Sequence, residues 1–74
     1  MMTYIVEARY LGYDQDKDSR IEKKVGAECV GAGLWFDRHQ LKRNVTFEFK
    51  SLKKAYAAAR KARMIHGVRA AVIR

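Results

Sequence analysis

The hydrophobic pattern of the chain is most regular over residues 44–50, where Val45, Phe47 and Phe49 alternate with polar residues. A period of two is typical of a strand with one buried face. Residues 3–11 alternate in the same way and are rich in β-branched and aromatic side chains. Residues 28–36 and 68–73 are also rich in strand-forming residues. The pattern therefore predicts four strands.

Two segments between these strands have helical features. Residues 14–25 begin with acidic residues and end with lysines, which suits a helix dipole, and Ile21 and Val25 lie four apart on one face. Because two apolar anchors are few, a long loop or an edge strand remains an alternative for this segment. Residues 52–65 are dense in alanine, follow a serine that suits an N-cap and are followed by His66-Gly67, which supplies a C-terminal stop. This second segment predicts a helix.

The predicted order of elements is strand, weak helix, strand, strand, strong helix, strand. This is the order of a ferredoxin-like βαββαβ domain. If the first helix is absent, the chain forms a small antiparallel sheet of about four strands packed against one long C-terminal helix. Both alternatives belong to the α+β class. With 74 residues and no proline, the chain is expected to form a single domain over residues 1–74.

The composition indicates a cytoplasmic protein. Cys29 is the only cysteine, which excludes an internal disulfide and fits a reducing compartment. No apolar run approaches the ~20 residues of a membrane span, and the N-terminus lacks the pattern of a signal peptide. We therefore expect no contact with a membrane.

All of the net charge lies in the last third of the chain. Residues 1–48 carry eight Lys/Arg and eight Asp/Glu, whereas residues 49–74 carry eight Lys/Arg and no acidic residue. A charge of +8 on one helix and one strand makes a strong local field, and such a field attracts polyanions. The charge pattern thus indicates a preferred kind of partner surface.

The predicted second helix carries most of this charge on one side. At 100° per residue, the side expected to face the sheet contains Leu52, Ala55, Tyr56, Ala59 and Ala62. The exposed side is cationic, with Arg63 near its apolar edge, and contains Lys53, Lys54, Arg60 and Lys61. Solvent-exposed helices usually mix charges, because opposite charges four residues apart stabilise them. We interpret this face as a surface for nucleic acid or an acidic protein; a merely soluble basic face is the alternative.

A second basic segment is the expected connection over residues 37–43. Arg38, Lys42 and Arg43 on a hairpin loop would reach a phosphate backbone or an acidic groove, although an ordinary polar turn explains them equally well. Trp35 and Phe36 precede this loop and should point to opposite faces of a strand. One of the two is therefore expected in the core and the other exposed. We include Trp35 among the candidate binding residues, as an aromatic beside cations.

No set of residues indicates catalysis, a metal or a cofactor. His39, His66 and Cys29 have no partners at a recognisable spacing. The acidic run over residues 14–18 is similar to the start of a calcium loop, but Ser19 and Val25 replace the required glycine and glutamate. We therefore predict a protein that is not an enzyme and needs no cofactor.

Two short segments resemble known families. Residues 49–59 resemble the strand-to-helix junction of small three-stranded DNA-binding domains, such as plant AP2-type and phage integrase arm-type domains. The arginine- and tryptophan-rich strands of those domains are not matched by the apolar residues of strand 44–50.

Residues 51–73 resemble small phage-encoded anti-CRISPR proteins of the type I systems. The matched positions are Ser51, Leu52, Ala55, Ala59, Lys61, His66 and Gly67, followed by the strand over residues 68–73. The resemblance implies a helix packed on an antiparallel sheet, whose basic residues dock on a guide-RNA surveillance complex where target DNA would bind, or hold duplex DNA. Of the aligned cations only Lys61 is present, and Lys53, Lys54 and Arg60 would replace the others.

These observations predict a small basic protein that inhibits a larger nucleoprotein complex by occupying its nucleic-acid-binding surface. Its partner would be an acidic or nucleic-acid-lined surface such as that of a CRISPR surveillance complex. The alternative is a stand-alone DNA- or RNA-binding module that contacts phosphates. A third hypothesis is an assembly module that forms a homodimer through a sheet edge or through the region of Trp35 and Phe36.

Overall fold

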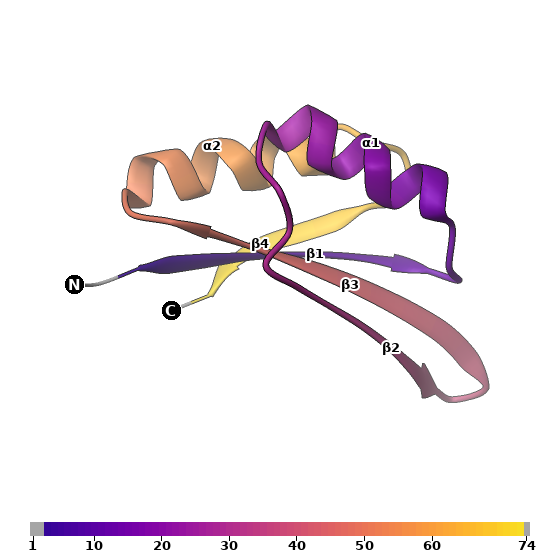
Figure 1. Cartoon of the computed structure of the whole chain (residues 1–74). Helices are drawn as coiled ribbons and strands as arrows, with labels where there is room; N and C mark the ends of the chain where they lie inside the picture. Colours follow the sequence, from indigo (N-terminus) through magenta and orange to yellow (C-terminus); the bar gives the residue numbers. More distant parts are fainter. Residues whose placement is uncertain (1–2, 74) are drawn as a thin grey trace.

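The computed structural model describes residues 3–73, which form a four-stranded sheet with two helices on one face (Figure 1). The elements are, in order, β1 (Tyr4–Leu11), α1 (Gln15–Val25), β2 (Gly31–Asp37), β3 (Gln40–Phe49), α2 (Leu52–Arg63) and β4 (Arg69–Ile73). The strand order is β2-β3-β1-β4, and all neighbours are antiparallel. This is the ferredoxin-like βαββαβ fold, so the predicted class and element order are confirmed.

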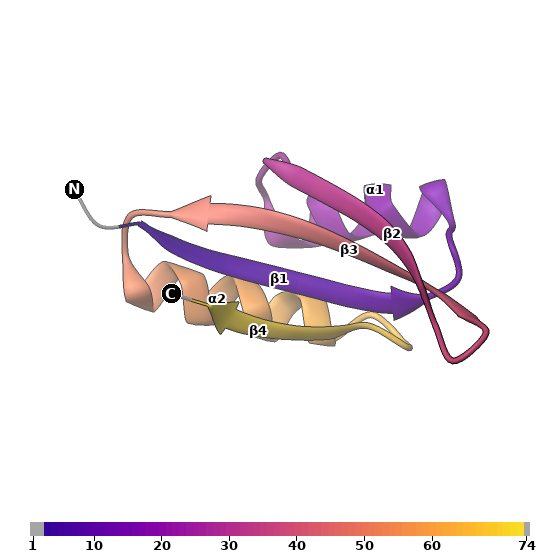
Figure 2. The ribbon, with the colours of Figure 1, turned by 90° about the horizontal axis from the view of Figure 1, so that it is seen from below.

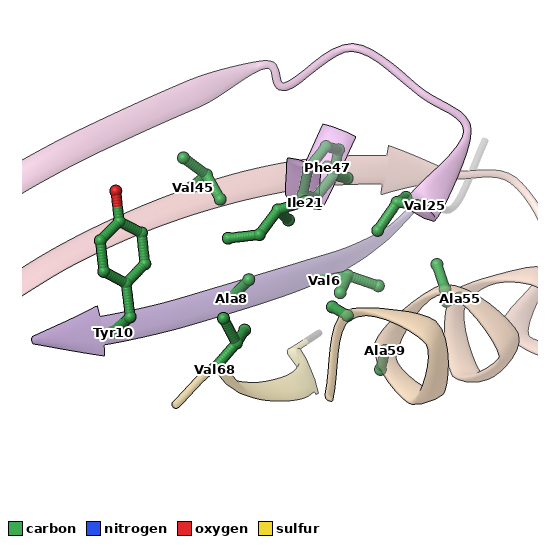
Figure 3. Close-up of a cluster of buried hydrophobic side chains, with 12 residues drawn as sticks. Val6, Ala8, Tyr10, Ile21, Val25, Val45, Phe47, Ala55, Ala59 and Val68 are labelled. Atoms are coloured by element: carbon green, nitrogen blue, oxygen red, sulfur yellow. The ribbon is translucent and has the colours of Figure 1, made fainter. Parts of the chain in front are cut away.

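The core lies between the helices and the inner face of the sheet (Figure 3). In the central strand β1, Val6 is paired with Phe47 of β3, and Ala8 with Val45. Ile21 of α1 packs over these side chains and is completely buried. Because strand residues alternate between faces, the intervening residues form the opposite, open face of the sheet, which no helix covers (Figure 2).

The first helix forms because both of its ends are capped. The Asp14 side chain accepts hydrogen bonds from the backbone N–H of Asp16 (2.9 Å) and Lys17 (3.3 Å). Gly26 ends the helix in the left-handed conformation, at φ 79°. These caps exclude the loop and edge-strand alternatives for residues 14–25. With 11 and 12 residues, neither helix of residues 3–73 is long enough to cross a membrane.

The connection between β2 and β3 is much shorter than expected. Only Arg38 and His39 lie between the strands, with φ of 53° and 68°. Two positive φ values define a type I′ turn, whose twist matches that of the paired strands. The predicted connection over residues 37–43 was therefore wrong. The short turn was not predicted because Arg38-His39 is not one of the Asn-Gly or Asp-Gly pairs that usually indicate a type I′ turn. The resulting long hairpin extends past the helices and curves away from them (Figure 1).

Candidate nucleic-acid interface

Helix α2 approaches the sheet closely because its buried side is made of alanine. Ser51 caps the helix, and its Oγ accepts a hydrogen bond from the Lys54 backbone N–H at 3.4 Å. The buried residues are Ala55, Ala58, Ala59 and Ala62. They lie against β1 and β4, and their spacing of three and four residues gives one continuous stripe. The position of this stripe determines which side chains α2 presents to solvent.

The side of α2 opposite the alanines is cationic. Its five basic residues are exposed, and they are Lys53, Lys54, Arg60, Lys61 and Arg63. Within residues 3–73 none of them forms an ion pair, although Arg63 Nη1 donates a hydrogen bond to the Ala70 carbonyl at 3.1 Å. The structure thus brings together all five helix residues that the sequence indicated.

The basic residues at the start of α2 oppose the helix dipole. Lys53 and Lys54 occupy the first turn, which contains no acidic residue. The N-terminus of a helix carries a partial positive charge, so each cation there is unfavourable, by about 0.3–1 kcal/mol at an exposed site. The placement of these lysines therefore does not serve the stability of the helix.

Tyr56 is a binding candidate that the sequence analysis missed. It was predicted to face the sheet, but its side chain is 53% exposed. Ala58 occupies the buried stripe instead, because an all-alanine stripe at 55, 58, 59 and 62 packs closer than one containing a tyrosine. The regular spacing of the alanines at 55, 58, 59 and 62 is the sequence pattern that could have indicated the exposure of Tyr56. Tyr56 lies one helical turn from Lys53 and from Arg60, and we call these six residues (the five cations and Tyr56) the cationic α2 face.

The predicted basic loop is divided between different parts of the molecule. Arg38 is exposed at the hairpin turn. Lys42 lies on the open face of the sheet, where its Nζ contacts Asp37 Oδ2 at 2.9 Å. Arg43 follows on the inner face, so these three cations do not form one surface.

Arg43 belongs to the scaffold that holds α1 on the sheet. Its Nη2 and Nε donate to Asp18 Oδ2 at 2.7 and 3.1 Å, and both side chains are about 15% exposed. The Tyr10 hydroxyl donates to the other oxygen of the same carboxylate. The hydrogen bond to Asp18 raises the pKa of Arg43, and burial together with this carboxylate raises the pKa of Tyr10 to about 12. The guanidinium of Arg43 is therefore already engaged within the fold.

Trp35 and Phe36 point to opposite faces of β2, as predicted, but neither enters the core. Trp35 is half-buried on the open face, with the Arg9 guanidinium carbon 5.7 Å from its ring centroid. Phe36 points to the helix side and is 76% exposed, because the hairpin extends past α1. The expectation that one of the pair is a core residue was wrong.

The candidate residues therefore lie on two faces. The cationic α2 face is in the helix layer, whereas Trp35 and Lys42 are paired in the β2–β3 register and lie on the open face of the sheet. Arg9 and Arg69 join them there, directly paired across β1 and β4. The sequence alone does not indicate these two arginines, because the pairing of strands whose residues are 60 positions apart is set by the tertiary fold.

Cys29, like Arg43, forms a hydrogen bond to a carboxylate of α1 and belongs to the scaffold of the fold. Its backbone N–H donates to Glu22 Oε2 at 3.0 Å, and its side chain is half-buried against the core rather than fully inside it. Burial, with the nearby Glu22 carboxylate, raises the pKa of its thiol. A raised pKa keeps the thiol protonated and unreactive near neutral pH. Residues 3–73 contain no cluster of three potential metal ligands.

No protein-family model and no curated protein matches the chain. Two solved structures share its fold. The ACT domain of GTP pyrophosphokinase from Chlorobium tepidum is similar over 97% of this chain and 85% of that chain, with a TM-score of 0.65 and 12% identity. An uncharacterised protein from Thermotoga maritima is similar over 96% of this chain and 92% of that chain, with a TM-score of 0.59 and 12% identity. At this identity the likeness concerns the fold alone.

Proposed function

We propose that this protein is a noncatalytic binding protein whose cationic α2 face docks on nucleic-acid phosphates. One observation carries the proposal: five exposed cations on a single helix have no acidic neighbour on that helix and no ion-pair partner within residues 3–73. Such a surface gains free energy by releasing counterions from a phosphate backbone. Tyr56, between Lys53 and Arg60, adds a flat side chain that can lie against a sugar or base.

In this proposal, the α2 face docks on nucleic acid that is bound within a larger complex. A protein groove that holds nucleic acid is itself cationic, so it would repel this face, whereas a bound guide RNA or target duplex would attract it. Docking there would block the complex sterically, as the resemblance to type I anti-CRISPR proteins implies. Binding of free DNA or RNA by the same face is the alternative form of this function.

The role of the α2 face is tested with labelled duplex and single-stranded oligonucleotides by fluorescence anisotropy. We expect dissociation constants of about 10⁻⁴–10⁻⁶ M at physiological salt for free nucleic acid, weakening steeply as salt increases. Lys53→Glu/Lys54→Glu/Arg60→Glu/Lys61→Glu should weaken binding by at least about 100-fold, because four phosphate contacts become repulsive. Its circular dichroism should stay unchanged, since all four residues are exposed. A correctly folded variant that binds like wild type would refute the assignment.

The two forms of the function are separated by a pull-down from host lysate with and without nuclease. Recovery of one stoichiometric nucleoprotein complex after nuclease treatment supports docking on a complex. Recovery, without nuclease, of nucleic acid but of no stoichiometric set of proteins supports binding of free nucleic acid. The four-fold Glu variant is the control, and it should recover neither.

A second candidate function, homodimeric assembly, is favoured by the exposed inner side of β2. This edge strand has unpaired backbone groups, and Leu34 and Phe36 lie exposed on the side that α1 leaves uncovered. Val30, just before the strand, is also exposed. Apolar side chains on an open edge strand are typical of a surface that pairs with another strand. Residues 30–37 carry only one charge, Asp37, so two copies of this cationic protein repel each other least at this edge.

Assembly through β2 is tested by light scattering after size-exclusion chromatography over a range of concentrations. We expect the mass to rise toward twice the monomer mass, and Phe36→Ser to shift this transition to at least tenfold higher concentration. Met64→Ser, which removes an exposed apolar side chain at the end of α2, is the matched control and should have no effect. A mass that stays at the monomer value at every concentration would rule out this assembly.

A further inference from the structure

The open face of the sheet contains a cleft that is separate from α2. The residues that line the cleft lie where β1 ends and where β3 and β4 begin. The β2–β3 hairpin curves away from the helices, toward this side of the sheet (Figure 1). Its volume is about 650 Å³, within the range of small-molecule sites. The side chains from the open face that line it are those of Arg9, Leu11, Gln40, Lys42 and Arg69.

The charges around this cleft favour an anion. Arg9 and Arg69 lie directly opposite each other on β1 and β4, a placement that is unfavourable for two like charges. Arg9 Nε contacts Glu7 Oε1 at 2.6 Å, and Lys42 contacts Asp37, but Arg69 has no ion-pair partner within residues 3–73. The cleft and its surroundings therefore contain three cations (Arg9, Lys42 and Arg69) and two carboxylates (Glu7 and Asp37). A phosphate between the two arginines would remove their repulsion and accept hydrogen bonds from both guanidinium groups.

A flat aromatic surface adjoins the cationic cleft. Trp35 is paired with Lys42 in the β2–β3 register and lies on the same open face. Its half-buried ring is fixed beside the Arg9 guanidinium, 5.7 Å from ring centroid to guanidinium carbon. Indole and guanidinium groups are both planar surfaces on which nucleobases stack. Gln40, exposed at the edge of the cleft, offers a donor and an acceptor to the edge of a base.

We propose that this open face binds a nucleoside phosphate, with the base against Trp35 and the phosphate in the cleft between Arg9, Lys42 and Arg69. A base can reach Trp35 only when it is unpaired, so the ligand is a free nucleotide or a nucleotide of a single strand. The site is on the opposite side of the sheet from the cationic α2 face. It does not depend on the function proposed for that face.

The site contains its own reporter, because Trp35 is the only tryptophan of the chain. A base stacked on the indole quenches its fluorescence, so the intact protein is titrated with AMP, with a single-stranded octanucleotide and with a duplex of the same sequence. We expect saturable quenching by AMP or by the single strand, and none by the duplex. Equal affinity for AMP and octanucleotide would identify a nucleotide site, and at least tenfold tighter octanucleotide binding would identify a single-strand site.

Two substitutions that remove one charge each test the phosphate position. Arg69→Gln should weaken the quenching interaction at least about tenfold, because it removes the free guanidinium of the cleft. Arg20→Gln on α1 also removes one exposed guanidinium and lies outside both proposed binding surfaces, so it is the matched control and should change the affinity less than twofold. The four-fold Glu variant of α2 should keep the quenching by AMP, whether or not the function proposed for α2 holds. Absence of quenching by AMP and single strand, equal quenching by duplex, or equal losses in the two single variants would overturn the proposal.

Discussion

The two helices of this protein both end in basic residues, but they differ in the charges at their N-terminal ends. Helix α1 has Asp16 and Asp18 in its first turn and Lys23 and Lys24 in its last, so both ends match the helix dipole. Helix α2 has lysines in its first turn and no acidic residue anywhere along its length. The two helices pack side by side on the same face of the same sheet. Their difference therefore does not come from their position in the fold.

The helices also differ in how they are attached. Helix α1 inserts Ile21 into the core and is tied to the sheet by the carboxylate of Asp18, which contacts Tyr10 and Arg43. Helix α2 relies on its alanine stripe and uses none of its charged groups in an ion pair within residues 3–73. In α1 a charged group attaches the helix to the sheet through an ion pair, whereas in α2 the five cations have no ion-pair partner within residues 3–73. This contrast supports a binding role for α2.

The largest effect should come from the core anchor of α1. Ile21→Ala should lower the free energy of unfolding by about 2–5 kcal/mol, because it leaves a cavity at a completely buried site. For α2, enlarging a buried side chain is the damaging change. Ala59→Leu should lower the free energy of unfolding by about 1–3 kcal/mol, because Ala59 is buried and the added atoms would overpack the site. Ala57→Leu, at an exposed position of the same helix, is the control. Urea unfolding measures all three, and an unaffected Ile21→Ala variant would contradict the packing described for α1.

The polar attachment of α1 predicts a loss of stability at alkaline pH. The pKa of Tyr10 is raised from 10 to about 12, first by burial and then by the hydrogen bond to Asp18. Since the pKa is higher in the folded state, the stabilisation is complete below pH 10 and is lost as the pH rises through 12. The loss should amount to about 2–3 kcal/mol in unfolding experiments. Tyr10→Phe should remove this part of the pH dependence; a variant with the same alkaline loss as wild type would contradict the assignment.

The smallest effects concern the helix dipoles and should have opposite signs in the two helices. Lys53→Glu/Lys54→Glu should stabilise the protein by about 0.3–1 kcal/mol per residue, because it places acidic residues at the start of α2. Lys23→Glu/Lys24→Glu should destabilise it by a similar amount, because it places them at the end of α1. Thermal unfolding at low salt detects both shifts. Equal shifts in the same direction would show that overall charge, and not the dipoles, determines the result.

The sequence predicted the parts of the structure that depend on local patterns. The alternation of β1 and β3, the N-cap serine of α2 and its row of cations are all visible in the printed residues, and so the element order and the basic helix could be predicted. Whether Ala58 or Tyr56 belongs to the buried side of α2 depends on how closely the helix packs against the sheet. The local pattern alone does not determine this, and in the structure Tyr56 is exposed. The pairing of Arg9 with Arg69, and of Arg43 with Asp18, joins distant residues and exists only in the folded chain.

The central claim is that the charge of α2 serves binding and that the charge of α1 serves the fold. It is tested most directly by comparing the affinities of Lys53→Glu/Lys54→Glu and Lys23→Glu/Lys24→Glu for the same labelled oligonucleotide at one salt concentration. Both variants change the net charge by the same amount, so any difference between them reports position. We predict at least a tenfold greater loss of affinity for the α2 variant, even though it is the more stable protein. Equal losses in the two variants would contradict the claim and reduce binding to an effect of net charge.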